Sequence, residues 1–276
     1  MAGSPLQPVA GVADLSVVRE RLRVTGTDRV QFLQGQCTND IQKLSAGQCC
    51  YGAFLTAKGK MRGEGHVMCL PDAFLLETSP GLRPALEKFI ITEDVAIEDV
   101  TGVYGEWLAI GGADAPPPAG AVLFEHPLGA GIVGAGRMTA TIGPEELEAL
   151  RIEAGVPRWG MDMDENTIPN EAGLESRAIS YDKGCYIGQE TIARIKTYGH
   201  VNRQLVQLAL ETDVTPARGG RILDGAREVG QVTSAVRSQR LGKPLALGYV
   251  RRELARTGIK LRIAETNAEV TKVCGE

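Results

Sequence analysis

Short alternating runs of apolar and polar residues dominate the first 110 positions and predict β-strands. After a strand at 22–25, the apolar residues at 30–33 predict a short helix capped by Thr27 or Asp28. Candidate strands at 50–57, 61–70 and 73–78 are separated by the turns Lys58-Gly59-Lys60 and Pro71-Asp72. Connections this short predict an antiparallel meander. A helix at 82–91 and strands at 95–100 and 107–110 are expected to follow.

The middle of the chain changes from alternation to helical periodicity and then to an irregular stretch. Gly129 to Gly134 has the spacing G-x-G-x-x-G of a dinucleotide loop, but strand-like residues rather than a helix follow it, so we interpret it as a glycine-rich strand. A helix is predicted from Pro144 to Gly155. Residues 157–180 lack a regular pattern, and loops this long are usually functional or disordered. A capping or solvated role is the more common one for acidic residues in such a segment, but five of them are also candidate bases or ligands: Asp162, Asp164, Glu165, Glu171 and Glu175.

The stretch Lys183-Gly184-Cys185-Tyr186-Ile187-Gly188-Gln189-Glu190 stands just ahead of a helix expected to end at Gly199. A thiol at a helix entrance with an ammonium nearby is favoured as the thiolate, which attacks electrophiles or binds metal. Cys185 and Lys183 are therefore the candidate catalytic residues. The alternative interpretation is a small buried cysteine in a tight connection, and the residues alone do not decide between the two.

Beyond Gly199 the pattern consists of short strands at close spacing, which predict a small barrel or sandwich. The expected strands are 203–210, 220–223, 228–236, 245–251, 260–263 and 268–272. We therefore predict two domains, residues 1–199 and residues 200–276. Residues 1 to about 13, rich in Ala, Gly and Pro, are expected to form a mobile tail.

Composition narrows the classes of function. The 276 residues are 43% hydrophobic and 23% charged, as in ordinary globular proteins, and the net charge of −4 disfavours direct nucleic-acid binding. No apolar run approaches the roughly 20 residues of a membrane span, so no membrane association is expected. Six cysteines without a Cys-x-x-Cys pair, and no secretory signal, point to a reducing cytoplasm. Three scattered histidines predict no metal site.

Several stretches, in order, resemble one family. They are FLQGQCTND at 32–40, LTAKGKM at 55–61, RIEAGVP at 151–157, IPNEAGL at 168–174, KGCYIGQE at 183–190, GQVTS at 230–234 and ALGYV at 246–250. Together they resemble the folate-binding relatives of the glycine cleavage system T-protein. Within that superfamily they are most similar to the YgfZ-type branch, which includes mitochondrial iron–sulfur assembly factors. The resemblance extends from about Leu22 to Arg251.

The resemblance implies an α+β fold, with a GcvT-like folate-binding N-terminal part around a central opening and a small C-terminal β-barrel. It implies tetrahydrofolate, or a related folate, as cofactor, with Glu171 holding the pterin and Arg203 nearby. A carboxylate is suited to this task because it accepts two parallel hydrogen bonds from a 2-aminopyrimidinone edge. The branch signature implies roles for Gly184, Tyr186, Gly188, Gln189 and Glu190, together with Lys183 and Cys185.

One sequence motif differs from that of the T-proteins. The T-proteins carry a pair of aspartates on the strand after the glycine turn, and one of the two is catalytic. The matching stretch here, residues 60–65, reads Lys-Met-Arg-Gly-Glu-Gly. Glu64 is the nearest substitute, but its longer side chain displaces the carboxylate by about an ångström, which is enough to impair catalysis severely. Ordinary aminomethyl transfer is therefore doubtful.

Three functions remain. The first is a folate-binding accessory protein that supports the synthesis or repair of iron–sulfur enzymes, tRNA-modifying ones among them, with Cys185 as its working thiol. Its partners would be folate and iron–sulfur enzymes or assembly proteins. The alternative is a tetrahydrofolate-dependent one-carbon transferase of aminomethyl or methyl groups. The third is a binding scaffold in which Cys185 is structural.

Overall fold

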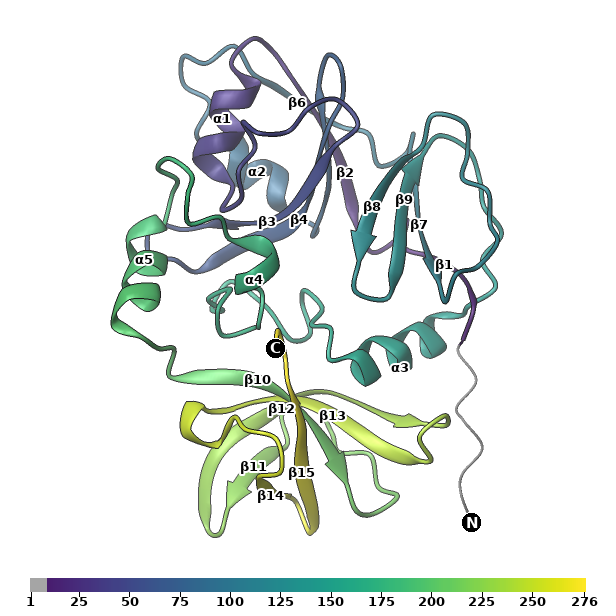
Figure 1. Ribbon diagram of the computed structural model, residues 1–276, viewed down its shortest axis with the longest axis vertical. Coiled ribbons are helices and arrows are strands. Elements are labelled where there is room, and N and C mark those ends of the chain that lie inside the picture. The colour runs from purple at the N-terminus through teal and green to yellow at the C-terminus, as the bar shows by residue number, and fades with distance from the viewer. Residues whose placement is uncertain (1–8) are drawn as a thin grey trace.

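The computed structural model describes residues 9 to 276, which form two sheets, a barrel and an irregular helical segment between them (Figure 1). The first sheet is antiparallel in the order β3-β4-β5-β2-β6. Its strands are β2 (Glu20–Thr25), β3 (Cys49–Leu55), β4 (Met61–Cys69), β5 (Phe74–Thr78) and β6 (Ala96–Asp99). Helices α1 (Arg29–Gln36) and α2 (Leu82–Glu87) bury Phe32, Leu33, Leu82 and Leu86 in one core with this sheet.

The second sheet, in the order β1-β7-β9-β8, is also antiparallel. It consists of β1 (Gly11–Asp14), β7 (Gly105–Ile110), β8 (Val122–His126) and β9 (Gly129–Gly134). Phe124 and Val133 of this sheet pack against Met68 and Leu75 of the first, so the two sheets share an apolar contact. Helix α3 (Pro144–Ala154) then leads towards the barrel.

The C-terminal strands close into a six-stranded barrel in the order β10-β13-β12-β11-β14-β15. Its elements are β10 (Arg203–Leu210), β11 (Arg221–Asp224), β12 (Arg227–Ser238), β13 (Lys243–Arg251), the 3-10 helix η1 (Arg252–Leu254), β14 (Lys260–Ile263) and β15 (Thr266–Val273). Closure leaves no free sheet edge in this part of the chain. The interior is filled by aliphatic side chains such as Val206, Leu208 and Val250.

Between α3 and the barrel, the chain crosses the middle of the molecule and carries the short helix α4 (Glu175–Ala178) and the helix α5 (Gln189–Tyr198) (Figure 1). This segment is well packed despite its irregular backbone. Ala172, Leu174 and Ile192 share a core with Leu55 and Met61 of the first sheet. The irregular segment is therefore fixed against the strands that carry the LTAKGKM turn.

A buried network around the Arg151–Asp162 ion pair joins α3 to the barrel. Arg151 donates from Nη1 to Asp162 at 2.7 Å and from Nη2 to Ser234 at 2.7 Å. Asp162 also accepts from the hydroxyls of Thr233 and Ser234, and its backbone carbonyl accepts from Tyr249. Every oxygen of Asp162 is thereby engaged, which assigns this residue a structural role rather than that of a free base.

The α+β fold with a C-terminal barrel is confirmed, as is the antiparallel meander of β3, β4 and β5. The glycine-rich stretch at 129–134 is a strand, β9, as predicted. Part of the predicted N-terminal tail is wrong, because residues 11–14 pair with β7 as β1. The rest of that prediction, residues 1–8, lies outside the described residues. The domain boundary at residue 199 stays a prediction.

Replacing Asp162 by alanine is expected to lower the free energy of unfolding by about 1–3 kcal/mol, because Arg151, Thr233 and Ser234 lose a buried acceptor, although Arg151 keeps its ion pair with Glu148. The matched control is Asp213→Ala, which removes an exposed ion pair with Arg237 and should cost about 0.5 kcal/mol or less. Urea denaturation of both variants measures the difference. Equal losses would show that the buried network does not hold the barrel to α3.

Candidate functional site

The loop at residues 183–190 is anchored by the ammonium of Lys183. Its Nζ donates to the backbone carbonyls of Gln34 at 2.7 Å, Cys37 at 2.6 Å and Asn39 at 2.8 Å. These carbonyls lie at or just after the C-terminal end of α1, where a helix leaves acceptors without partners and its dipole favours a cation. Lys183 therefore caps α1 from a position about 146 residues further along the chain.

Other hydrogen bonds fasten the same two segments together. The backbone amide of Ile187 donates to Gly35 O at 3.0 Å, and that of Ser180 donates to Thr38 O at 3.1 Å. The hydroxyl of Thr38 donates to Ala178 O at 2.6 Å. The boxes FLQGQCTND and KGCYIGQE, far apart in sequence, are thus one structural unit.

The hydrogen bonds of the Lys183 ammonium go to backbone carbonyls of another segment and not to the Cys185 thiol. An ammonium has three N–H donors, and all three are bound to carbonyls, so none is left for the sulfur. Burial lowers the pKa of Lys183, although the surrounding acidic groups oppose this. The ammonium also lies 5.0 Å from the centre of the buried Tyr186 ring. The visible role of Lys183 is to position the loop, and a catalytic role stays a prediction.

Cys185 is exposed, whereas the other five cysteines are buried or half-buried. Beside it, a Cβ on Gly184 would meet nothing within 4 Å, so packing does not require glycine there. Gly188 is different: its φ is +86°, and a Cβ would lie 2.6 Å from Thr56 O. Gly188 therefore has a structural reason to be glycine, while Gly184 leaves bare backbone beside an accessible thiol.

Of the remaining signature residues, one is buried and supports the loop, and the others lie in the first turn of α5. Tyr186 is buried beneath Lys183, and that burial raises the pKa of Tyr186 to about 12. Gln189 is the first residue of α5, in agreement with the predicted helix. Its backbone N–H donates to Tyr186 O at 3.2 Å. Glu190 lies in the first turn of α5 and pairs with the exposed Arg194 at 2.6 Å. Cys185 itself thus lies four residues before α5.

Glu171 and Arg203, predicted from two separate boxes, are in direct contact. Arg203 donates from Nε and Nη2 to Glu171 Oε2 at 3.2 and 3.1 Å. The guanidinium also lies 4.4 Å from the centre of the Tyr249 ring. Burial lowers the pKa of Arg203, but the bonds and charge of Glu171 outweigh it and raise that pKa overall. All hydrogen bonds that residues 9–276 donate to the Glu171 carboxylate end on Oε2, so Oε1 has no partner within the described residues.

Glu64, the sequence counterpart of the T-protein aspartate, is not free. It is buried, and its carboxylate accepts from the Tyr51 hydroxyl at 2.8 Å and from the guanidinium of Arg19. Arg19 also bonds Glu77, whose other oxygen contacts His66 Nδ1 at 2.7 Å. Although burial raises the pKa of Glu77, Arg19 and His66 hold it well below its usual range.

Sequence reasoning missed Tyr51, Arg19 and Arg177 around this carboxylate. The guanidinium of Arg177 stacks at 3.9 Å from the centre of the Tyr51 ring. Burial, with the adjacent Glu64 charge, holds the pKa of Tyr51 well above its ordinary value. The motif at residues 60–65 was the only sequence signal for this group of residues. Arg19 could not be recognised because it precedes β2 in a stretch without a motif.

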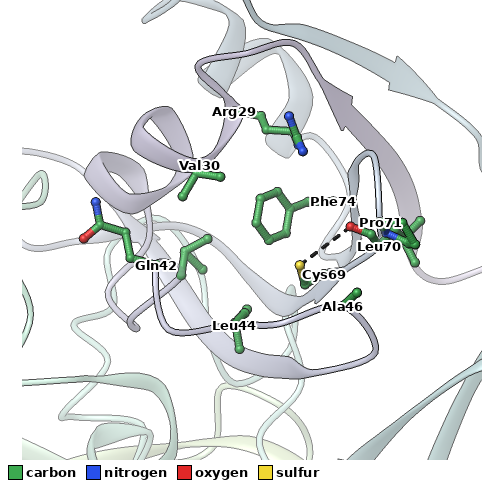
Figure 2. A pocket seen from close by; sticks show the side chains of 10 residues that line it. Arg29, Val30, Gln42, Leu44, Ala46, Cys69, Leu70, Pro71 and Phe74 are labelled. Atoms are coloured by element: carbon green, nitrogen blue, oxygen red, sulfur yellow. Dashed lines mark hydrogen bonds between the residues drawn. The ribbon is translucent and has the colours of Figure 1, made fainter.

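Two shallow pockets, of about 190 and 560 Å³, lie elsewhere (the smaller is shown in Figure 2), and neither is lined by a predicted site residue. Among residues 9–276, no group of three or more His, Cys, Asp or Glu is arranged to hold a metal ion. No helix in the described part of the chain is both long and apolar enough to cross a membrane.

Comparison with known families assigns both ends of the chain. Residues 6–118 match the GCVT N-terminal domain, and residues 203–274 match the glycine cleavage T-protein C-terminal barrel domain. The aminomethyltransferase T of the Bartonella henselae glycine cleavage system has the same fold, with a TM-score of 0.81 and 18% identity. That comparison covers 97% of this chain and 86% of the other.

Three of the relatives that match by sequence have different names. The tRNA-modifying protein YgfZ of Yersinia pestis is 29% identical over 258 residues, which cover 77% of this chain and 76% of the relative. An aminomethyltransferase of Thermosynechococcus vestitus is 38% identical over 148 residues, covering 54% of this chain. A chloroplastic protein of Arabidopsis thaliana, named as a transferase, is 28% identical over 289 residues, covering 89% of this chain. The chain spans only 38% of the length of the Thermosynechococcus relative and 66% of that of the Arabidopsis one.

Replacing Lys183 by methionine is expected to lower the free energy of unfolding by about 3 kcal/mol, because three backbone carbonyls, two of them in buried hydrogen bonds, lose a charged donor. Gly184→Ala, the neighbouring control, should change stability by about 0.5 kcal/mol or less, since its side chain meets only open space. Urea denaturation measures both. A Lys183→Met variant as stable as the parent would contradict the anchoring role.

Proposed function

Because the chain belongs to the superfamily of the glycine cleavage T-protein, we propose that it is a folate-binding accessory protein of the YgfZ type. It supports the synthesis or repair of iron–sulfur enzymes, tRNA-modifying ones among them, and its working thiol is Cys185. The name of the Yersinia relative, a tRNA-modifying protein, supports this direction. The proposal places the protein in the cytoplasm, where reducing conditions keep thiols free.

The Glu171–Arg203 pair supports the folate half of the proposal. Arg203 holds Oε2 of the carboxylate in place and leaves Oε1 available to the N–H donors of a pterin edge. The guanidinium is itself held against the Tyr249 ring, which limits the conformational freedom lost on binding. Tetrahydrofolate, or a related folate, is the cofactor that this arrangement would take.

The observation that carries the thiol half is the exposure of Cys185 on a loop fixed by Lys183. The neighbouring Gly184 also borders open space, because a Cβ built there would meet nothing within 4 Å. One cysteine cannot hold an iron–sulfur cluster alone. An iron–sulfur enzyme or assembly protein would therefore supply the remaining ligands when it meets Cys185.

The second candidate is a tetrahydrofolate-dependent one-carbon transferase, which is favoured by the match to an aminomethyltransferase. The hydrogen bonding of the Glu64 carboxylate argues against this second candidate. Arg19 and Tyr51 both donate to this carboxylate, so its oxygens are already occupied by hydrogen bonds within the protein. For Glu64 to act in one-carbon transfer, its hydrogen bonds to Arg19 and Tyr51 would have to break when the substrate binds.

Calorimetry with tetrahydrofolate tests the folate half. The Glu171→Gln variant should bind at least about tenfold more weakly, because charge-assisted hydrogen bonds are worth about 1.5–3 kcal/mol each. The matched control is Glu175→Gln on the neighbouring helix, whose carboxylate bonds Asn170, Tyr181 and Lys196 rather than Arg203. It should bind as the parent does.

The same folate-loaded protein should show no aminomethyl transfer from a carrier protein. Turnover that is lost in Glu64→Gln would replace the accessory proposal by the transferase. Parent-like folate affinity of Glu171→Gln would remove Glu171 from the binding site.

A further inference from the structure

Arg177 is a half-buried arginine of α4, and its guanidinium lies 3.9 Å from the centre of the Tyr51 ring. Within residues 9–276, the nitrogen atoms of this guanidinium form no hydrogen bond and no ion pair. They are not enclosed either, because none of them is among the buried polar atoms that lack a partner. Arg177 is therefore an unpaired cation that a ligand can reach.

The backbone holds this cation in place. Asn39 Nδ2 donates both to Tyr51 O at 2.8 Å and to Arg177 O at 3.2 Å, which ties the end of α4 to β3. The face of the Tyr51 ring attracts the guanidinium and restricts its orientation without neutralising its charge. An anionic ligand would meet a donor that is already oriented, so less conformational entropy would be lost on binding.

The acidic side chains around Arg177 are engaged with other cations. Glu64, whose carboxylate accepts from the Tyr51 hydroxyl, is paired with Arg19. Glu175, two residues before Arg177, is paired with the ammonium of Lys196 at 3.4 Å. The charge of Arg177 is thus left for an anion from outside the described chain.

Arg177 and Glu171 border the same apolar cluster. Three half-buried residues pack on the core beneath them: Tyr51, Trp159 and Ile168. The backbone N–H of Ile168 donates to Glu171 Oε2 at 3.4 Å, and the Tyr51 ring carries the guanidinium of Arg177. Glu171 Oε1 is not enclosed, since it too is missing from the buried atoms without a partner. One accessible apolar surface therefore carries an open carboxylate oxygen and an unpaired guanidinium.

We propose that Arg177 binds a glutamyl carboxylate of the folate. A folate has three chemically different parts, which are a pterin with N–H donors, an aminobenzoyl ring and an anionic glutamate. Glu171 suits the first part, the half-buried apolar side chains suit the second, and Arg177 suits the third, because its planar fork matches a carboxylate. This role rests on the proposed folate binding and extends it, since Arg177 would recognise the tail of the ligand rather than its pterin.

Calorimetry with two ligands tests the role of Arg177. They are tetrahydrofolate and 6-methyltetrahydropterin, which lacks the aminobenzoylglutamate. The Arg177→Gln variant should bind tetrahydrofolate at least about tenfold more weakly than the parent does, and should bind the pterin as the parent does. Retained pterin binding also shows that the variant is folded. The matched control, Arg83→Gln, removes an exposed helical arginine paired with Glu87 and should change neither affinity.

The parent protein alone provides a second measurement. Tetrahydrofolate should bind at least about tenfold more tightly than the pterin at low salt, and this advantage should shrink as potassium chloride is added, because salt screens an accessible ion pair. Equal affinities of the parent for the two ligands would overturn the role of Arg177. An Arg177→Gln variant that binds tetrahydrofolate like the parent, or loses both ligands to the same extent, would overturn it too.

The same titrations separate this role from the proposed function. Glu171→Gln should weaken the binding of both ligands, because it changes the group that holds the pterin. A parent protein that binds both ligands equally keeps the proposed folate site and removes only the tail contact of Arg177. A parent protein that binds neither ligand overturns the proposed folate binding, and the role of Arg177 with it.

Discussion

The contact between the Lys183 ammonium and three backbone carbonyls is the constraint on which the candidate site depends. The carbonyls of Gln34, Cys37 and Asn39 converge where α1 ends and the chain turns. A compact ammonium with three donors satisfies such a convergent set, whereas the planar fork of an arginine is suited to two parallel acceptors. By holding this end of α1, Lys183 also fixes the backbone that presents Cys185, two residues away.

Three acidic or nucleophilic groups of the site are held in different states, and this difference suggests where chemistry takes place. Glu64 is buried and bonded to Arg19 and Tyr51, so its carboxylate is already satisfied. Glu171 is held through one oxygen and open at the other, as suits a binding group. Cys185 alone is exposed on a fixed backbone. This arrangement on a T-protein fold is the basis of the proposal that the protein binds a folate through Glu171 and works through the Cys185 thiol.

Local sequence signals predicted the elements well where they were strong. Proline and two glutamates opened α3, and Gly155 and Gly199 ended α3 and α5 in left-handed conformations. Strand β1 was missed because its four residues, Gly-Val-Ala-Asp, continue an Ala- and Gly-rich stretch and gain order only by pairing with β7. Strand β8 was missed because only Phe124 among its five residues is buried.

The site was predictable only in part, because its decisive contacts are distant in sequence. The resemblance brought Glu171 and Arg203 to attention, and the structure places them in contact. Arg19 could not be foreseen, since its partners Glu64 and Glu77 lie 45 and 58 residues away. Lys183 was assigned to its sequence neighbour Cys185, yet its hydrogen bonds go to carbonyls about 145 residues earlier. The Lys183 side chain points to the end of α1 because that end is buried and has carbonyls without partners. Neither property can be inferred from the sequence around Lys183.

The most direct test of the central claim is complementation of a bacterial strain lacking YgfZ by the Cys185→Ser variant, scored by the activity of its iron–sulfur enzymes. Cys37→Ser does not serve as a control because that residue is buried, whereas Cys69→Ser changes a half-buried cysteine outside the loop and should complement fully. The account predicts that Cys185→Ser folds and binds tetrahydrofolate as the parent does but fails to restore enzyme activity. Full restoration by Cys185→Ser would contradict it.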